Sequence, residues 1–153
     1  MSVNLKKEDL IDILSNISIF YGISNEDIEK MIKLLRPITM QENTLVIRQG
    51  TKGQSMYIIK TGNVEVVRVD EKKEEVIIAV LRDGDYFGEL SLIDNMPRSA
   101  NVITKEKSEI FQLTKDDFDK FLLENNGAAN IFYKNCLIET FHRFRDIISK
   151  YTF

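Results

Sequence analysis

The segment Gly84–Val102, GDYFGELSLIDNMPRSANV, gathers residue types that could hold a phosphorylated sugar. Gly88 lets the backbone approach a ligand closely, and a short helix beginning near Glu89 would direct free N–H groups toward an anion. Glu89 could accept hydrogen bonds from hydroxyl groups. Arg98, nine residues later, carries a fixed charge on forked donors that suit a phosphate, and Ser99 adds a hydroxyl. The segment thus offers an anion cradle, a cation and an acceptor for hydroxyls.

The two charged residues of this segment also have a purely structural interpretation. Glu89 could simply stabilise the dipole of its own helix. Arg98 could pair with Glu89 on the surface, which would contribute only ~0–1 kcal/mol to stability. Residue types alone leave the binding site and the surface pair both open.

Composition narrows the possible functions. The chain has 153 residues, of which 43% are hydrophobic and 29% charged, as is typical of one globular domain. Its net charge of −3 and the lack of a basic stripe argue against a nucleic acid partner. No apolar run approaches the ~20 residues that a membrane span needs, and the N-terminus carries no export signal. We therefore expect a cytoplasmic protein without a membrane partner.

The single histidine and single cysteine limit metal and catalytic chemistry. One residue of each kind excludes the four Cys/His ligands of common zinc sites, and the multi-histidine set of a cupin-like metalloenzyme. Cys136 and His142 would lie on different faces of a helix, which argues against a catalytic dyad. No nucleophile elbow and no phosphate-binding loop pattern is present. We expect a protein that is not an enzyme and has no metal site.

The region before the candidate segment changes from helical to β periodicity. Residues 5–37 are expected to form helices, with Ser24 as an N-cap and Pro37 ending the last helix near Arg36. Residues 38–113 hold short β-rich runs cut by glycine turns, which predicts a small antiparallel barrel or roll. The apolar residues Met56 and Ile58, then Val64 and Val66, alternate as in half-buried strands, whereas Val76–Leu81 reads as a more fully buried strand.

The helical signal returns in residues 114–151. Thr114 is expected to cap a helix that carries Phe118, Phe121 and Leu122 on one side. Gly127 marks a break, and a longer helix follows from Ala128 to about Tyr151. Its apolar residues are spaced by four and three, like a short heptad seam: Leu137, Phe141, Phe144, Ile148 and Tyr151.

The sequence YFGELSLIDNMPRSANV resembles the phosphate-binding cassette of the cyclic nucleotide-binding domain family. Upstream, IRQGTKGQSMYIIKTGNVEVV is similar to the family's early strands, and GISNEDIEKMIKLLRP resembles its N-terminal helix. The resemblance implies an α+β fold in one domain spanning residues 1–153. That fold is an eight-stranded antiparallel β-roll, a jelly-roll-like double-stranded β-helix, with N-terminal helices and a long C-terminal helix.

The resemblance also implies roles for individual residues. Glu89 would bind the ribose 2′-hydroxyl, Arg98 the cyclic phosphate, and Ser99 a phosphate oxygen or the base. Backbone N–H groups would cradle the ribose phosphate, and Arg143 or Arg145 could stack on the base. The ligand-binding residues expected on this basis are Phe87, Gly88, Glu89, Leu90, Ser91, Arg98, Ser99, Ala100, Arg143 and Arg145.

The function implied is that of a stand-alone, non-enzymatic sensor of a cyclic nucleotide. We expect cAMP rather than cGMP as the ligand, because the chain resembles bacterial-type members. Nucleotide binding would reposition the C-terminal helix, which could pair two copies of the chain or contact an unknown effector protein. The alternative is a degenerate domain of the same fold that acts as an interaction module and binds no nucleotide.

Overall fold

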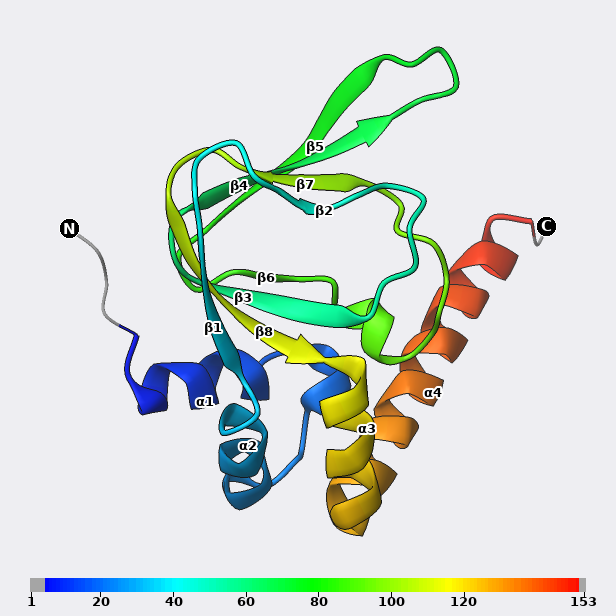
Figure 1. Cartoon of the computed structure of the whole chain (residues 1–153). Coiled ribbons are helices and arrows are strands. Elements are labelled where there is room, and N and C mark those ends of the chain that lie inside the picture. The colour runs from blue at the N-terminus through cyan, green and yellow to red at the C-terminus, as the bar shows by residue number, and fades with distance from the viewer. Residues whose placement is uncertain (1–4, 152–153) are drawn as a thin grey trace. The chain divides into compact units, whose positions relative to one another are not determined.

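The computed structural model describes residues 5–151 and divides the chain into two compact units (Figure 1). The roll unit, Leu34–Asp119, contains every strand, and the helical unit joins Lys7–Lys33 to the chain from Lys120 onward. The helices are α1 (Lys7–Ser15), η1 (Ser18–Phe20), α2 (Asn25–Ile32), η2 (Glu89–Leu92), α3 (Lys115–Glu124) and α4 (Asn126–Ser149), where η marks a 3₁₀ helix. No helix in the described part of the chain is long and apolar enough to cross a membrane.

The roll unit consists of two four-stranded antiparallel sheets, in the orders β1-β8-β3-β6 and β2-β7-β4-β5. The strands are β1 (Arg36–Met40), β2 (Leu45–Ile47), β3 (Ser55–Thr61), β4 (Asn63–Val69), β5 (Glu75–Arg82), β6 (Tyr86–Phe87), β7 (Asn101–Thr104) and β8 (Ser108–Thr114). The predicted eight-stranded antiparallel roll is therefore confirmed, and its two sheets do not close into a barrel.

Apolar side chains from both sheets form the core of the roll unit. The buried cluster comprises Ile47, Tyr57, Ile59, Val64, Phe87, Val102 and Ile110. Within it the rings of Tyr57 and Phe87 stack with their centroids 5.1 Å apart. Because Phe87 is the fourth residue of the cassette segment, Gly84–Val102, this stack anchors the start of that segment in the core.

Two predictions of strand burial were wrong. In β3 five consecutive residues, Ser55–Ile59, are buried, although alternation was expected. In β5 the run expected to be buried is exposed: the exposed fractions of Val76, Ile77 and Ile78 are 54%, 59% and 55%. The reason is position, because β3 lies between β8 and β6 and contacts η2, whereas β5 pairs only with β4 at a sheet edge.

The end of the second helix also differs from the prediction. Ser24 does cap α2, since its Oγ accepts a hydrogen bond from the Asp27 N–H at 3.2 Å. However, α2 ends at Ile32, and Arg36 and Pro37 already belong to β1. A proline is tolerated there because β1 is an edge strand, where one N–H group needs no partner in the sheet.

The start of α3 follows the prediction, and that of α4 lies close to it. Thr114 Oγ1 accepts a hydrogen bond from the Asp117 N–H at 3.1 Å, as expected of a cap, and Phe118, Phe121 and Leu122 are buried. The break before α4 falls at Asn125, so that Gly127 lies in the first turn of the helix.

Within the helical unit, α4 is tied to η1 near its middle. Asn135 Nδ2 donates to the carbonyl oxygens of Ile19 and Tyr21, at 3.1 and 2.8 Å. The later part of α4 is different, because its apolar seam is exposed: Leu137, Phe141, Phe144, Ile148 and Tyr151.

Candidate ligand-binding site

The cassette segment encloses a cavity of about 320 Å³ in the roll unit, here called the cassette cavity. Eight of the predicted ligand-binding residues line it: Phe87, Gly88, Glu89, Leu90, Ser91, Arg98, Ser99 and Ala100. The volume falls within the range of known small-molecule sites, which is roughly 300–1,000 Å³. Glu89 and Arg98, which are nine positions apart in the sequence, thus line the same cavity.

Gly88 sets the backbone at the start of the cavity. It has a left-handed conformation, with φ of 79°, and caps the short helix η2. A Cβ atom at this position would lie 2.8 Å from Arg98 Nη1 and 3.0 Å from the Ser55 carbonyl oxygen. Only glycine combines this φ with such close neighbours.

The short helix that the sequence predicted near Glu89 is η2, and its first N–H groups remain available. Among the residues that the structure describes, no hydrogen bond is donated by the backbone N–H of Glu89 or Leu90. Backbone N–H groups without a protein acceptor at a helix start can bind an anion. The half-buried Glu89 therefore sits beside a set of backbone donors.

Arg98 is held by backbone atoms on both sides of its guanidinium group. Nη2 donates to the Ser55 carbonyl oxygen at 2.6 Å, and Nη1 donates to that of Gly88 at 3.4 Å. No carboxylate of the described residues lies within ion-pair distance of Arg98, so the surface pair with Glu89 is not formed.

The electrostatic environment of Arg98 favours an added anion. Burial lowers the pKa of Arg98, and the nearby Tyr57, Glu89 and Asp94 act in the opposite direction. A guanidinium group remains charged despite such a shift. A half-buried cation bound mainly to neutral carbonyl oxygens can therefore gain a charge-assisted hydrogen bond from a phosphate.

Sequence reasoning gave no role at the site to Gly53, which is one of the glycines that separate the short β-rich runs. A Cβ atom there would overlap Ser91 Oγ and lie 2.6 Å from Arg98 Cζ. Gly53 therefore leaves the space in which the Arg98 side chain and the buried Ser91 side chain lie. No local pattern could reveal this, because Gly53 and Arg98 meet only in the folded roll.

The apolar wall of the cavity was also missed. Ile47 and Val66, which lie outside the cassette segment, line the cavity together with Val102 at the end of that segment. The alternation of Val64 and Val66 was noticed in the sequence, but it could not show that Val66 borders the cassette cavity. A lining that combines apolar side chains with a polar turn suits a ligand with a flat base and a phosphate.

Arg143 and Arg145 are the two predicted residues that do not line the cassette cavity. Both are exposed on α4, which belongs to the helical unit. Arg145 borders a different cavity, of about 290 Å³, together with Ile138, Phe141 and His142. Their contact with a base stays a prediction.

Comparisons with known proteins show which protein family this chain is similar to. The model of the cyclic nucleotide-binding domain family matches residues 37–125. The chain is 32% identical over 109 residues to the cAMP-dependent protein kinase regulatory subunit of Yarrowia lipolytica, covering 71% of this chain and 28% of that protein. It is 31% identical over 119 residues to the cGMP-dependent protein kinase egl-4 of Caenorhabditis elegans, covering 76% of this chain and 15% of that protein.

A solved structure of a related kinase regulatory domain is also similar to this chain. The regulatory domain of Toxoplasma gondii PKA, co-crystallised with cAMP, superposes with a TM-score of 0.68 at 29% identity, covering 78% of this chain and 47% of that one. The chain spans less than a third of the length of the two curated kinase proteins it matches. The family model covers more than half of the chain and includes the whole cassette segment; the chain belongs to the cyclic nucleotide-binding domain family.

Proposed function

We propose that the cassette cavity binds a cyclic nucleotide and that the chain works as a non-enzymatic regulatory sensor. One observation carries this proposal: Arg98 and the Gly88–Leu90 turn line one cavity together with the apolar side chains of Ile47, Val66 and Val102. Phosphate, sugar and base each find matching chemistry there.

Each predicted cassette residue has a role in this proposal. Arg98 pairs with the cyclic phosphate, and Glu89 accepts a hydrogen bond from the ribose 2′-hydroxyl. The N–H groups of Gly88, Glu89, Leu90 and Ala100 cradle the ribose phosphate. Ser99, which is exposed at the cavity, donates to a phosphate oxygen or the base. Phe87 and Ser91 are buried and shape the cavity beneath the ligand.

The proposed ligand is cAMP in preference to cGMP. Relatives of both kinds match this chain, one of them a cAMP-dependent kinase regulatory subunit and one a cGMP-dependent kinase. The likeness to a regulatory domain solved with cAMP supports the first choice. Ser99 leaves cGMP as the alternative, because its hydroxyl group could also reach a guanine amino group in the syn conformer.

The proposed signal is a change in the position of α4. Nucleotide binding would favour one arrangement of the cassette segment and α4 over another, as in a population shift. The whole chain, residues 1–153, would act as one domain in the cytoplasm. Arg143 or Arg145 would stack on the base, and a second copy of the chain or an effector protein would bind the exposed side of α4.

Calorimetric titration with cAMP, cGMP and 5′-AMP tests the binding proposal. We expect saturable binding of cAMP and weaker binding of cGMP. We expect no binding of 5′-AMP, because it lacks the cyclic phosphate. Cys136 then tests the signal, because it lies on α4 and is the chain's single cysteine. A fluorophore on Cys136 should change its emission when cAMP is added, whereas constant emission together with cAMP binding would reject the α4 movement alone.

A second candidate function is an interaction module that binds no nucleotide. The exposed apolar seam of α4 favours it, with Phe141 and Phe144 each more than half exposed. The same titration separates the two functions. Absence of heat and of thermal stabilisation with every nucleotide would leave the interaction module as the better explanation.

A further inference from the structure

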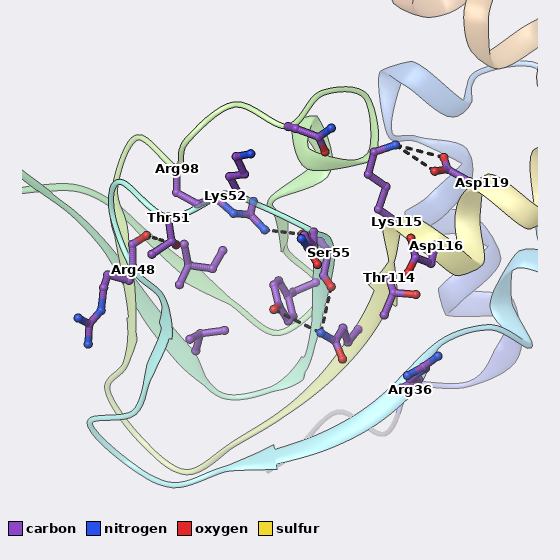
Figure 2. Close-up of a pocket in the computed structure, with 16 residues that line it drawn as sticks. Arg36, Arg48, Thr51, Lys52, Ser55, Arg98, Thr114, Lys115, Asp116 and Asp119 are labelled. Atoms are coloured by element: carbon purple, nitrogen blue, oxygen red, sulfur yellow. Dashed lines mark hydrogen bonds and ion pairs between the residues drawn. The ribbon is translucent and has the colours of Figure 1, made fainter.

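A second and larger cavity, of about 830 Å³, opens in the roll unit, and we call it the polar cavity. It shares only Ile47 and Arg98 with the cassette cavity. Its lining includes Gln112, whose Nε2 donates to Ser55 Oγ at 3.0 Å and to Tyr57 Oη at 3.5 Å. Figure 2 shows this cavity with Ser55 and Arg98 joined by a hydrogen bond.

The polar cavity concentrates positive charge in a chain that is negative as a whole. Two acidic side chains, Asp116 and Asp119, line it together with five basic ones: Arg36, Arg48, Lys52, Arg98 and Lys115. The lining therefore has an excess of three positive charges, whereas the net charge of the chain is −3. A cavity lined mainly by one sign of charge raises the local concentration of ions of the opposite sign.

The basic residues come from different parts of the roll unit and surround one space. Arg36 lies on β1, Lys115 begins α3, and Arg98 belongs to the cassette segment, while Arg48 and Lys52 follow β2. In Figure 2 they lie around the cavity rather than along one strand. Several anionic groups joined in one ligand could therefore each meet a different cation.

Backbone pairing joins the loop that carries Arg48 and Lys52 to the segment that carries Arg98. The Arg98 N–H donates to the Thr51 carbonyl oxygen at 2.7 Å, and the Gly50 N–H donates to the Arg98 carbonyl oxygen at 2.8 Å. Lys52 forms an isolated β-bridge with Pro97. The loop that carries Arg48 and Lys52 is thus bonded directly to the segment that carries Arg98.

The five cations differ in how far protein groups already satisfy them. Arg36 pairs with Asp117 at 2.8 Å, and Lys115 pairs with Asp119 at 3.1 Å. Arg48 and Lys52, both exposed, have no ion pair with any of the described residues. They are therefore the cations most able to bind a charged ligand.

We propose that the polar cavity is a second ligand site, and that it binds a linear oligophosphate, such as a triphosphate chain. Several linked phosphates match cations that stand on several sides, and guanidinium groups bind phosphate oxygens through paired donors. The hydroxyl groups of Thr51 and Ser55 and the amide of Gln112 add uncharged hydrogen-bonding groups to the lining. Arg98 lies between the two cavities, so an oligophosphate and a cyclic nucleotide are expected to weaken each other's binding reciprocally.

Calorimetric titration with inorganic tripolyphosphate, without divalent cations, tests this site. The protein should bind one tripolyphosphate per chain, and affinity should fall with added salt. The double variant Arg48→Gln/Lys52→Gln should bind at least about tenfold more weakly, since two charge-assisted contacts are lost. A matched control is Lys72→Gln/Lys73→Gln, which removes the same charge from the exposed turn after β4 and should bind within about twofold of the parent.

Further ligands identify the recognised group. Equal affinity for ATP and tripolyphosphate would mean that the phosphate chain is recognised, and tighter binding of ATP, lost in Arg48→Gln/Lys52→Gln, would mean that the nucleoside adds contacts; both support the site. No saturable binding, an equal loss in both double variants, or equal binding of a hexaglutamate peptide would overturn it. Tripolyphosphate has neither sugar nor base, and Arg48 and Lys52 line only the polar cavity, so a loss in Arg48→Gln/Lys52→Gln separates this site from phosphate binding in the cassette cavity.

Discussion

The cassette segment and helix α4 both carry predicted ligand-binding residues, but the fold constrains them very differently. In the cassette segment, backbone hydrogen bonds hold Arg98 on both sides of the chain, and a left-handed glycine fixes the turn before Glu89. On α4, Arg143 and Arg145 are exposed, as are the apolar residues around them. The position of a candidate site residue is well constrained when its own backbone is hydrogen-bonded to a neighbouring loop, as it is for Arg98. The position is less constrained when the residue lies on an exposed part of a helix, as Arg143 and Arg145 do.

The largest difference between the two regions is expected in stability. Leu92 in the cassette segment is 2% exposed, so Leu92→Ala should lower the free energy of unfolding by about 2–5 kcal/mol. Phe144 on α4 is 58% exposed, so Phe144→Ala should change it by less than about 0.5 kcal/mol. Urea denaturation of both variants measures this contrast. A large loss for Phe144→Ala that depends on protein concentration would show that α4 is buried between two copies of the chain.

The next effect concerns affinity. Arg98→Ala removes the charge-assisted contact to phosphate and should cost about 1.5–3 kcal/mol of binding, or roughly 10–150-fold in the dissociation constant for cAMP. Arg145→Ala on α4 should weaken binding less, because stacking of an exposed cation on a base contributes only about 0.5–1 kcal/mol. Calorimetric titration of both variants with cAMP measures these two losses of affinity. Unchanged affinity in Arg98→Ala would contradict the proposal that Arg98 binds the phosphate.

Alanine substitutions at two glycines should change the free energy of unfolding by smaller amounts and in opposite directions. Gly88→Ala places a Cβ in the left-handed region, close to Arg98, and should destabilise the protein by about 1–2 kcal/mol or more. Gly127 lies in the first turn of α4 with open space around it, so Gly127→Ala should stabilise by up to about 1 kcal/mol. Thermal unfolding reports both changes, and a stabilising Gly88→Ala would contradict the tight cassette turn.

The smallest effect is a shift in thiol reactivity on α4. Burial raises the pKa of Cys136, and the negative charge of Glu139 raises it further. Because only the thiolate reacts, the midpoint of the pH–rate curve for maleimide should lie above that of an unfolded cysteine peptide. Glu139→Gln should move the midpoint part of the way back, since burial remains. A midpoint equal to that of the peptide in the parent protein would mean that Cys136 is fully hydrated.

Much of the site followed from local sequence because its chemistry is concentrated in one segment. Glycine before glutamate, followed nine residues later by arginine, indicated the turn, the cradle and the cation together. The apolar lining did not follow, because Ile47 and Val66 come to the cavity only when their strands pair in the sheet. A residue pattern describes a strand but does not say which strands will lie beside it.

Strands β3 and β5 illustrate the same limit for the fold. Both contain consecutive apolar residues, MYII in β3 and VIIAV in β5, and the local pattern could not rank their burial correctly. What decides is whether a strand has neighbours on both sides, which depends on residues distant in the sequence. The end of α2 was likewise misplaced, because Pro37 fits an edge strand as well as it ends a helix.

The exposed apolar strand β5 has a consequence for solubility. An edge strand with unpaired backbone groups and exposed Val76, Ile77 and Ile78 is a template for uncontrolled strand pairing between molecules. The charged run EKKEE leads into this strand, and Arg82 ends it. Such charges act as gatekeepers against aggregation. We therefore expect the charged turn between β4 and β5 to oppose strand pairing between molecules, an effect separate from binding any ligand.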